Sequence, residues 1–256
     1  MTRIEIDVIP YFDDNFSYLI HQSGSSGATA LVDCGDAGPV LSFLENNNIN
    51  LNYILATHSH YDHAGDISSL VNQFPNATVI KPKGEKRIDV AGKEVSDGET
   101  IPFGDLIIEV LAVPAHTNYC LSYKIEDCIF VGDALFSAGC GRMFEGQPAD
   151  LERAMDKLSS LPGKTKVYFG HEYTKANLKF ALSIEPDNQK TKDYMTEVEE
   201  KVKSGMFSTP STIALEKEIN PFFRIDQDSV IKSIDPSKSL SRTERMAALR
   251  HRKDNF

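Results

Sequence analysis

Residues 58–63 form a dense cluster of side chains that commonly bind metals. His58, His60, Asp62 and His63 stand in the pattern His-x-His-x-Asp-His, directly after the apolar segment 53–56. Imidazole and carboxylate groups together suit zinc, iron or manganese. The chain has only 7 histidines in 256 residues, and three of them lie here, so a chance polar loop explains the cluster poorly. The spacing predicts a metal site that can serve two adjacent ions.

Further candidate ligands follow the ends of later apolar segments. His116 comes after the segment 106–113, Asp133 after 129–132 and His171 after 167–170. Open α/β sheets place their sites at the carboxyl ends of strands. Each of these residues alone would fit a surface position, and Asp133 alone would fit a helix cap. Because all of them share the same placement, we interpret them as parts of one site.

Strand-like and helical segments alternate through the first two thirds of the chain. The expected strands are 3–8, 17–21, 29–32, 53–56, 106–113, 121–125, 129–131 and 166–169, and the expected helices are 39–46, 66–74 and 150–158. The order strand, helix, strand and candidate ligand occurs twice, which indicates an internal repeat. Alternating strands and helices predict a layered α/β architecture, with a sheet-on-sheet core and helices outside.

From about residue 175 onward the sequence becomes charged and helical. Helices are expected over 177–184, 189–203, 211–218 and 242–252, whereas the polar stretch 226–241 is expected to be a loop. We therefore divide the chain into a catalytic domain, residues 1–174, and a small α-helical domain, residues 175–256.

Composition and charge narrow the choice of partners and compartment. A hydrophobic content of 41% is enough for a full globular core, and a net charge of -10 disfavours nucleic acid, which needs a basic face. No apolar run approaches the length of a membrane span, and residues 1–7 lack the apolar run of a signal peptide. The 4 cysteines show no C-x-x-C pairing, as is typical of reduced thiols. We expect a monomeric, cytoplasmic protein that binds neither membrane nor nucleic acid.

The ordered pattern of candidate ligands resembles that of the metallo-β-lactamase superfamily. Within it, the chain resembles the hydroxyacylglutathione hydrolases, the glyoxalase II family. The marks of that family are Ala-Gly-Cys-Gly-Arg-Met-Phe-Glu-Gly at 138–146, Gly-His-Glu-Tyr-Thr at 170–174, Asn-Pro-Phe at 220–222 and Arg-His-Arg-Lys-Asp at 250–254. The resemblance implies an αββα sandwich with a small C-terminal α-helical domain that binds substrate.

The resemblance also implies two divalent metal ions per chain, zinc in the first place and iron or manganese as the alternatives. It assigns His58, His60 and His116 to one ion, Asp62, His63 and His171 to the other, and Asp133 to both. Two cations near one water lower its pKa, so that it can attack a thioester carbonyl at neutral pH. Asp62 and Asp133 are then the expected catalytic carboxylates. The implied reaction converts S-D-lactoylglutathione to glutathione and D-lactate, a step of methylglyoxal detoxification.

The resemblance implies glutathione contacts at Arg142, Phe144, Tyr173, Arg250 and Lys253. Cationic side chains suit the carboxylates of a tripeptide, and arginine can bind one through two parallel bonds. The chain departs from the family at two of these positions. Arg142 stands where the family has lysine, and Phe144 stands where the family has tyrosine, so one hydroxyl is missing.

A third departure follows His116. The chain reads Thr-Asn-Tyr-Cys there, where the family usually has Thr-x-Gly-His. The missing histidine is not one of the implied ligands, so the ligand set is complete. Cys120 is expected to be a buried small side chain rather than a further ligand.

Other functions share parts of this pattern. A class B β-lactamase normally has cysteine at the position of Asp133 and lacks His63. A persulfide dioxygenase has the same fold with a single iron, and it does not usually keep the substrate residues of the Arg142 type. A non-enzymatic metal-binding protein would need no substrate pocket. The last two functions are the alternatives to thioester hydrolysis.

Overall fold

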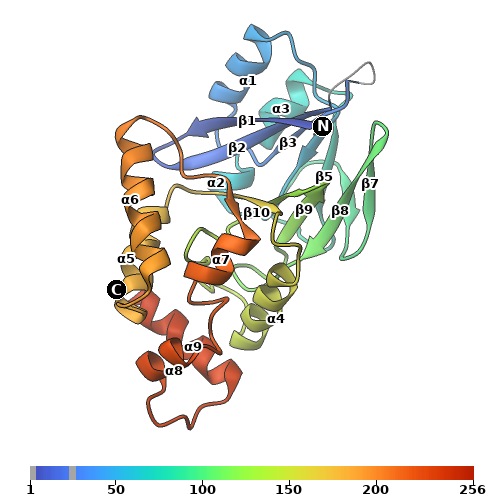
Figure 1. Cartoon of the computed structure of the whole chain (residues 1–256). Helices are drawn as coiled ribbons and strands as arrows, with labels where there is room; N and C mark the ends of the chain where they lie inside the picture. The colour runs from blue at the N-terminus through green and yellow to red at the C-terminus, as the bar shows by residue number, and fades with distance from the viewer. Residues whose placement is uncertain (1–3, 23–26) are drawn as a thin grey trace. The chain divides into compact units, whose positions relative to one another are not determined.

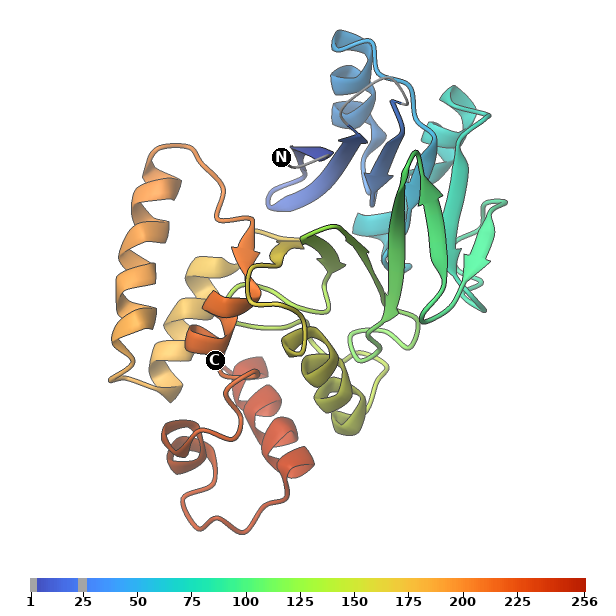
Figure 2. The same cartoon turned by 45° about the vertical axis from the view of Figure 1, so that its right-hand side comes forward.

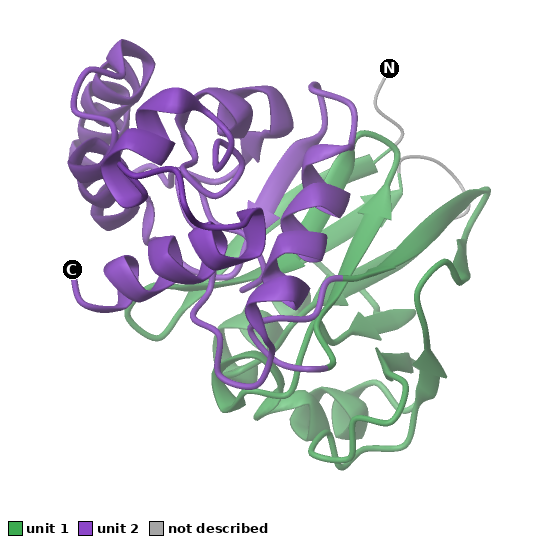
Figure 3. Cartoon of the chain, turned by 90° about the horizontal axis from the view of Figure 1, so that it is seen from below, with its two compact units in different colours: residues 1–112, 119–132 green, residues 113–118, 133–256 purple. Residues whose placement is uncertain are grey.

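The computed structural model describes residues 4–22 and 27–256 (Figure 1 and Figure 2). The chain divides into two compact units, as Figure 3 shows: unit 1 has residues 1–112 and 119–132, and unit 2 has residues 113–118 and 133–256. Residue 3, where the first strand is expected to begin, lies outside the described residues. These two units are defined by the packing of the chain. The division at residue 174 into a catalytic and a helical domain is a functional one, and it stays a prediction.

The first sheet lies in unit 1, and its six strands are arranged in chain order. The strands are β1 (Ile4–Tyr11), β2 (Asn15–Gln22), β3 (Thr29–Val32), β4 (Tyr53–Leu55), β5 (Thr78–Pro82) and β6 (Lys93–Val95). The pairs β1–β2 and β2–β3 are antiparallel, whereas β3–β4, β4–β5 and β5–β6 are parallel. Parallel neighbours need a crossover connection. Helices α1 (Ala37–Asn46) and α3 (Ile67–Gln73) lie in the first two crossovers, beside the sheet (Figure 1).

Apolar residues at helical spacing hold these two helices on the sheet. Val40 and Leu44 of α1, together with Ile67 and Leu70 of α3, belong to one buried cluster with residues of the first sheet. Such an apolar stripe is what an amphipathic helix presents to a core. Strand β3 is buried along its whole length, as expected for a parallel strand that is covered on both faces.

Four further strands of unit 1 form an antiparallel meander. They are β7 (Thr100–Phe103), β8 (Leu106–Ala112), β9 (Leu121–Ile125) and β10 (Cys128–Gly132). The meander packs on the first sheet: the rings of Tyr18 and Phe130 have centroids 5.6 Å apart, and the Tyr123 hydroxyl donates to the Ala56 carbonyl at 2.7 Å. This sheet-on-sheet contact fixes the backbone just before His58.

Unit 2 is mainly helical. Its elements are α4 (Pro148–Ser159), β11 (Lys166–Phe169), α5 (Thr174–Ile184), α6 (Gln189–Lys203), β12 (Ser211–Thr212), α7 (Ile213–Ile219), α8 (Asp228–Ile234) and α9 (Arg242–Asp254). Helix α9 begins with a capping box, in which Ser241 and Glu244 each bind the other's backbone amide. Within the described residues, no helix is both long enough and apolar enough to span a membrane.

The structure corrects the expected loop over 226–241. Residues Asp228–Ile234 form helix α8, which buries Val230. The following turn is closed by Asp235, whose carboxylate accepts from the amides of Ser239 and Leu240 at 3.0 Å each. A helix this short needs only one buried residue to pack against its neighbours. Its sequence is therefore mostly polar and resembles that of a loop.

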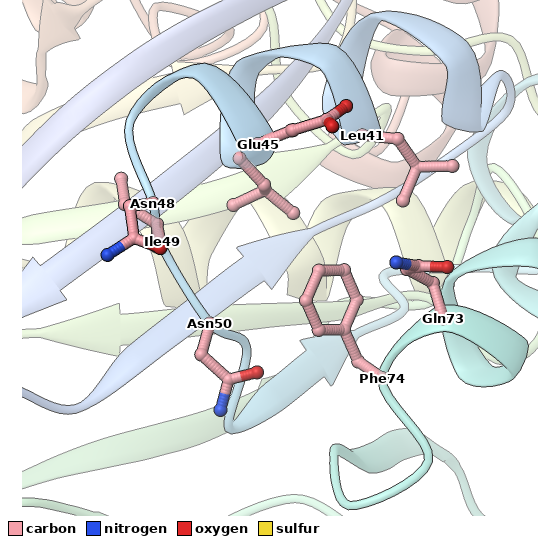
Figure 4. A pocket seen from close by; sticks show the side chains of 8 residues that line it. Leu41, Glu45, Asn48, Ile49, Asn50, Gln73 and Phe74 are labelled. Carbon is pink, nitrogen blue, oxygen red and sulfur yellow. The ribbon is translucent and has the colours of Figure 1, made fainter.

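The pocket in Figure 4 lies in unit 1, beside the ends of α1 and α3. It has a volume of about 490 Å³ and is lined by Leu41, Leu44, Glu45, Asn48, Ile49, Asn50, Gln73 and Phe74. None of the candidate ligands lines it, and it offers a single carboxylate. The pocket therefore has no part in the chemistry that the sequence predicts.

Candidate metal centre

The candidate ligands of unit 1 lie between β4 and α3. His58 follows β4, His60 immediately precedes the short helix α2 (Tyr61–Ala64), and Asp62 and His63 lie within it. His58 and His63 are buried, whereas His60 and Asp62 are half-buried. Nε2 of His58 lies 3.1 Å from Nδ1 of His60, and Nε2 of His63 lies 3.7 Å from Oδ2 of Asp62. The structure thus brings these four side chains together.

Asp33, at the end of β3, supports two of these histidines. Its Oδ2 accepts from the Thr57 hydroxyl at 2.7 Å and lies 2.8 Å from Nδ1 of His63, and its Oδ1 accepts from the Thr57 amide at 2.7 Å. The Thr57 hydroxyl in turn lies 3.0 Å from Nδ1 of His58. Since Nδ1 of both rings takes part in these bonds, Nε2 of each ring keeps its lone pair for a cation.

Replacing Asp33 by Asn should therefore weaken metal binding by about ten- to a hundredfold. The amide removes the charge and cannot accept the same bonds, while asparagine tolerates the left-handed backbone of Asp33, where φ is 59°. Titration of the metal-free protein with zinc against a competing chelator measures the change. Asp36→Asn, in the same loop, is the matched control. Equal affinities of the two variants and the wild type would show that Asp33 has no such role.

Two polar side chains of the β1–β2 hairpin hold Asp62. The Tyr11 hydroxyl donates to the Asp62 carbonyl at 2.6 Å, and Nδ2 of Asn15 donates to Asp62 Oδ2 at 3.1 Å. A Cβ at Gly35 would lie 2.4 Å from the Asp62 carbonyl oxygen, so only glycine allows this close approach. The sequence pattern does not reveal Tyr11 or Asn15, because both are far from the histidine cluster along the chain.

The other candidate ligands lie together in unit 2 and are buried. Oδ2 of Asp133 lies 3.5 Å from Nε2 of His116 and 3.3 Å from Nε2 of His171. Nδ1 of His116 donates to the Arg142 carbonyl at 2.8 Å, which leaves the lone pair of its Nε2 available to a cation. Imidazole nitrogens directed in this way beside a carboxylate are a donor set that fits a divalent cation.

The backbone around Asp133 is closely packed. A Cβ at Gly141 would lie 2.1 Å from the Asp133 carbonyl oxygen and 2.9 Å from Nδ1 of His116. Any larger residue at this position would displace one of the two candidate ligands. The second glycine of the Gly-Cys-Gly-Arg motif, Gly141, is therefore required for steric reasons, which the sequence alone does not show.

The turn 136–139, which follows Asp133, is held by buried polar groups of α7 and of its C-cap, Asn220. Glu216, fully buried, accepts from the Ser137 hydroxyl at 2.9 Å and from the Ala138 amide at 2.8 Å. Nδ2 of Asn220 donates to the carbonyls of Phe136 and Gly139 at 3.2 and 3.0 Å. Burial raises the pKa of Glu216. These bonds hold Ala138 in the left-handed region, at φ 56°.

The aromatic candidates for substrate binding lie next to candidate ligands. The Tyr173 ring stacks on His171, with centroids 4.7 Å apart and an angle of 5°. Phe144 meets the His116 ring edge-on at 5.3 Å. Both aromatic side chains are exposed, so each can contact a ligand as well as the histidine beside it.

The two cationic candidates of α9 differ in burial. The Arg250 side chain is 5% exposed, and its NH1 donates to the Cys140 carbonyl at 2.9 Å. Lys253 is half-buried, with Nζ 5.0 Å from the centroid of the Phe180 ring. Burial is the main cause that lowers the Lys253 pKa. Arg250 thus fixes the 140–141 backbone, and Lys253 is the more accessible cation.

The cysteines are buried free thiols. Cys120 immediately precedes β9 and is 2% exposed, in agreement with the buried role expected for it. Burial raises the pKa of Cys140 to about 11, so this thiol is neutral at pH 7. Among the described residues, no group of side chains that could hold a metal includes a cysteine.

Known families match the chain over nearly its whole length. A model of the metallo-beta-lactamase superfamily matches residues 10–171, and a model described as the hydroxyacylglutathione hydrolase C-terminus matches residues 172–256. A hydroxyacylglutathione hydrolase from Photobacterium profundum is 43% identical over 99% of this chain and 100% of its own length. One from Aliivibrio fischeri is 42% identical with the same coverage.

Solved structures resemble the chain more distantly. ETHE1 from Myxococcus xanthus has a TM-score of 0.67 and 25% identity, covering 98% of this chain and 100% of its own. TTHA1623, solved in a di-iron-bound form, has a TM-score of 0.61 and 20% identity, covering 85% and 99%. Together with the family models, these likenesses confirm the predicted fold.

Proposed function

Because the chain belongs to the hydroxyacylglutathione hydrolase family of the metallo-β-lactamase superfamily, we propose that it hydrolyses S-D-lactoylglutathione to glutathione and D-lactate. The observation that carries this proposal is 43% identity to a hydroxyacylglutathione hydrolase over 99% of the chain. The family's C-terminal model matches the segment with the candidate glutathione residues, so the likeness extends beyond the metal-binding part. Such an activity would remove the thioester that arises from methylglyoxal.

The proposed enzyme holds two divalent ions, zinc first and iron or manganese as alternatives. We assign His58, His60 and His116 to one ion, Asp62, His63 and His171 to the other, and Asp133 to both. The hydrogen bonds of Asp33, Thr57 and Arg142 support this assignment, since they orient the Nε2 lone pairs of three histidines. Divalent ions there would supply a water of lowered pKa and polarise the thioester carbonyl.

The residues of the chain then orient the reactants. Asp62, held by Asn15, accepts a hydrogen bond from the attacking water and so directs its lone pair. Asp133 keeps its carboxylate beside His116 and His171. A thiolate is a good leaving group, so the reaction needs no strong general acid.

The glutathione part is proposed to bind along residues of unit 2. Arg142 and Lys253 meet its carboxylates, Phe144 and Tyr173 contact its apolar atoms, and Arg250 supports this surface through the Cys140 carbonyl. In functional terms, residues 1–174 are the catalytic domain and residues 175–256 the substrate-binding domain. We also propose that the enzyme is monomeric and cytoplasmic and needs no nucleic-acid or membrane partner.

Hydrolysis by the purified, metal-loaded protein tests the proposal. The loss of thioester absorbance of S-D-lactoylglutathione should be fast, and that of a small thioester without the glutathione carboxylates should be slow. The metal content is measured in the same sample. Equal rates on the two thioesters would refute the substrate assignment, and no hydrolysis by fully loaded protein would refute the activity itself.

A further inference from the structure

Arg142 is held at one edge by a carboxylate of the same chain. Its Nε lies 3.3 Å from Oδ1 of Asp254. Neither of its terminal nitrogens has a hydrogen-bond partner among the residues that the structure describes. The side chain is 55% exposed, and its guanidinium lies 6.0 Å from the centroid of the exposed Phe144 ring. The guanidinium is thus fixed at Nε, and its two terminal nitrogens can bind a ligand.

Asp254 is itself fixed. The same Oδ1 atom accepts from NH2 of Arg250 at 2.9 Å. Arg250 is buried, its NH1 binds the Cys140 carbonyl, and its guanidinium lies 5.4 Å from the centroid of the Phe222 ring. A carboxylate that is bound to a buried, immobile cation loses little entropy when it also binds a second one. Asp254 is therefore a rigid anchor for Arg142.

The backbone of Arg142 connects this anchor to the candidate metal centre. Its carbonyl accepts from Nδ1 of His116 at 2.8 Å. A ligand that binds the Arg142 guanidinium is consequently close to His116, which is assigned to the reacting centre. This proximity suits a substrate whose carboxylate and thioester are parts of one molecule.

We propose that Asp254 is a positioning residue for a substrate carboxylate. It binds Nε of Arg142, so that the two terminal nitrogens together receive the carboxylate, and Phe144 supports the guanidinium from its face. This inference rests on the proposed function and names the device that selects a glutathione thioester over an uncharged one. Arginine alone can be anchored in this way, because its donors form a planar fork.

Lysine at this position would behave differently. It has one nitrogen, so its contact with Asp254 would compete with its contact with the substrate. The effect of Asp254 on substrate binding should therefore depend on which residue stands at position 142. If Asp254 only stabilised the fold, its effect on substrate binding would be the same with arginine and with lysine at position 142.

Asp254→Ala, Arg142→Lys and the double variant test the proposal. In the wild-type background, Asp254→Ala should raise KM for S-D-lactoylglutathione by roughly three- to tenfold and leave kcat unchanged, since the loss is about one charged hydrogen bond. In the Arg142→Lys background, the same replacement should leave KM unchanged or lower it. Calorimetric titration with glutathione should show the same pattern in Kd, without any turnover.

Asp254→Asn is the second variant, because it keeps an acceptor oxygen for Arg250 and so preserves the fold if alanine does not. Its KM should rise less than that of Asp254→Ala. If Asp254→Ala raises KM equally with arginine and with lysine at position 142, or lowers kcat without raising KM, the proposal is wrong. The proposed function would not be affected by either result, provided that the wild type is active. A wild type that neither binds glutathione nor hydrolyses its thioester overturns the proposed function, and this inference with it.

Discussion

Asp133→Ala should lose metal from both sites together and lower kcat by about a thousandfold. Asp133 Oδ2 lies 3.5 Å from His116 Nε2 and 3.3 Å from His171 Nε2, and we assign these two histidines to different ions. Removing a shared carboxylate deletes a bond to each ion and also the negative charge that offsets their mutual repulsion. No other replacement of a single ligand should weaken both sites equally.

Elemental analysis of the purified proteins, together with steady-state kinetics, measures this result. The fully loaded wild type should contain close to two ions per chain, because we assign the candidate ligands to two ions. Asp187→Ala, an exposed position between α5 and α6, is the control and should keep both metal and activity. A loaded wild type with one ion per chain, whose activity does not rise on adding metal, would exclude the binuclear site.

Replacing both Arg250 and Lys253 by Ala should raise KM for S-D-lactoylglutathione by up to about a hundredfold and lower kcat much less. Contacts far from the reacting carbonyl bind the ground state and the transition state alike, so their loss appears in KM. Hydrolysis of a small thioester without the glutathione carboxylates should hardly change. Arg252→Ala, which removes an exposed cation of the same helix, is the matched control.

The single variants should separate the two residues. Lys253→Ala should raise KM and leave the free energy of unfolding nearly unchanged. Arg250→Ala should also lower the free energy of unfolding, by about 2–4 kcal/mol, because it removes a buried cation and strands the Cys140 carbonyl and Asp254. Denaturant unfolding checks this difference. A wild-type KM in the double variant would show that neither residue serves substrate binding.

The candidate ligands could be predicted because their signal is local. The pattern of His58, His60, Asp62 and His63 occupies six consecutive positions, and a short loop followed by one helical turn keeps them close in any fold. The places of His116, Asp133 and His171 after strands can also be predicted, because an apolar run shows where a strand ends. The layered α/β class can be predicted from the alternation of strands and helices, whereas the αββα sandwich is what the family resemblance implies.

The supporting residues could not be predicted, because their signal is tertiary. From the sequence, Asp33 fits a turn residue and a residue that orients a ligand histidine equally well, and only its contacts with Thr57 and His63 favour the second interpretation. The sequence marks Arg250 as a substrate contact but cannot show its burial. Helix α8 cannot be predicted because its polar composition is typical of a loop.

The turn 136–139 also has a consequence for the order in which the protein matures. Its hydrogen-bond partners, Glu216 and Asn220, are 78 to 84 residues further along the chain. During synthesis on the ribosome, the segment after Asp133 therefore lacks these partners until almost the whole chain has emerged. Metal loading should accordingly be a late event of biosynthesis. In chains that end before α7, the Asp133 carboxylate should not be held in the position where it could bind two ions.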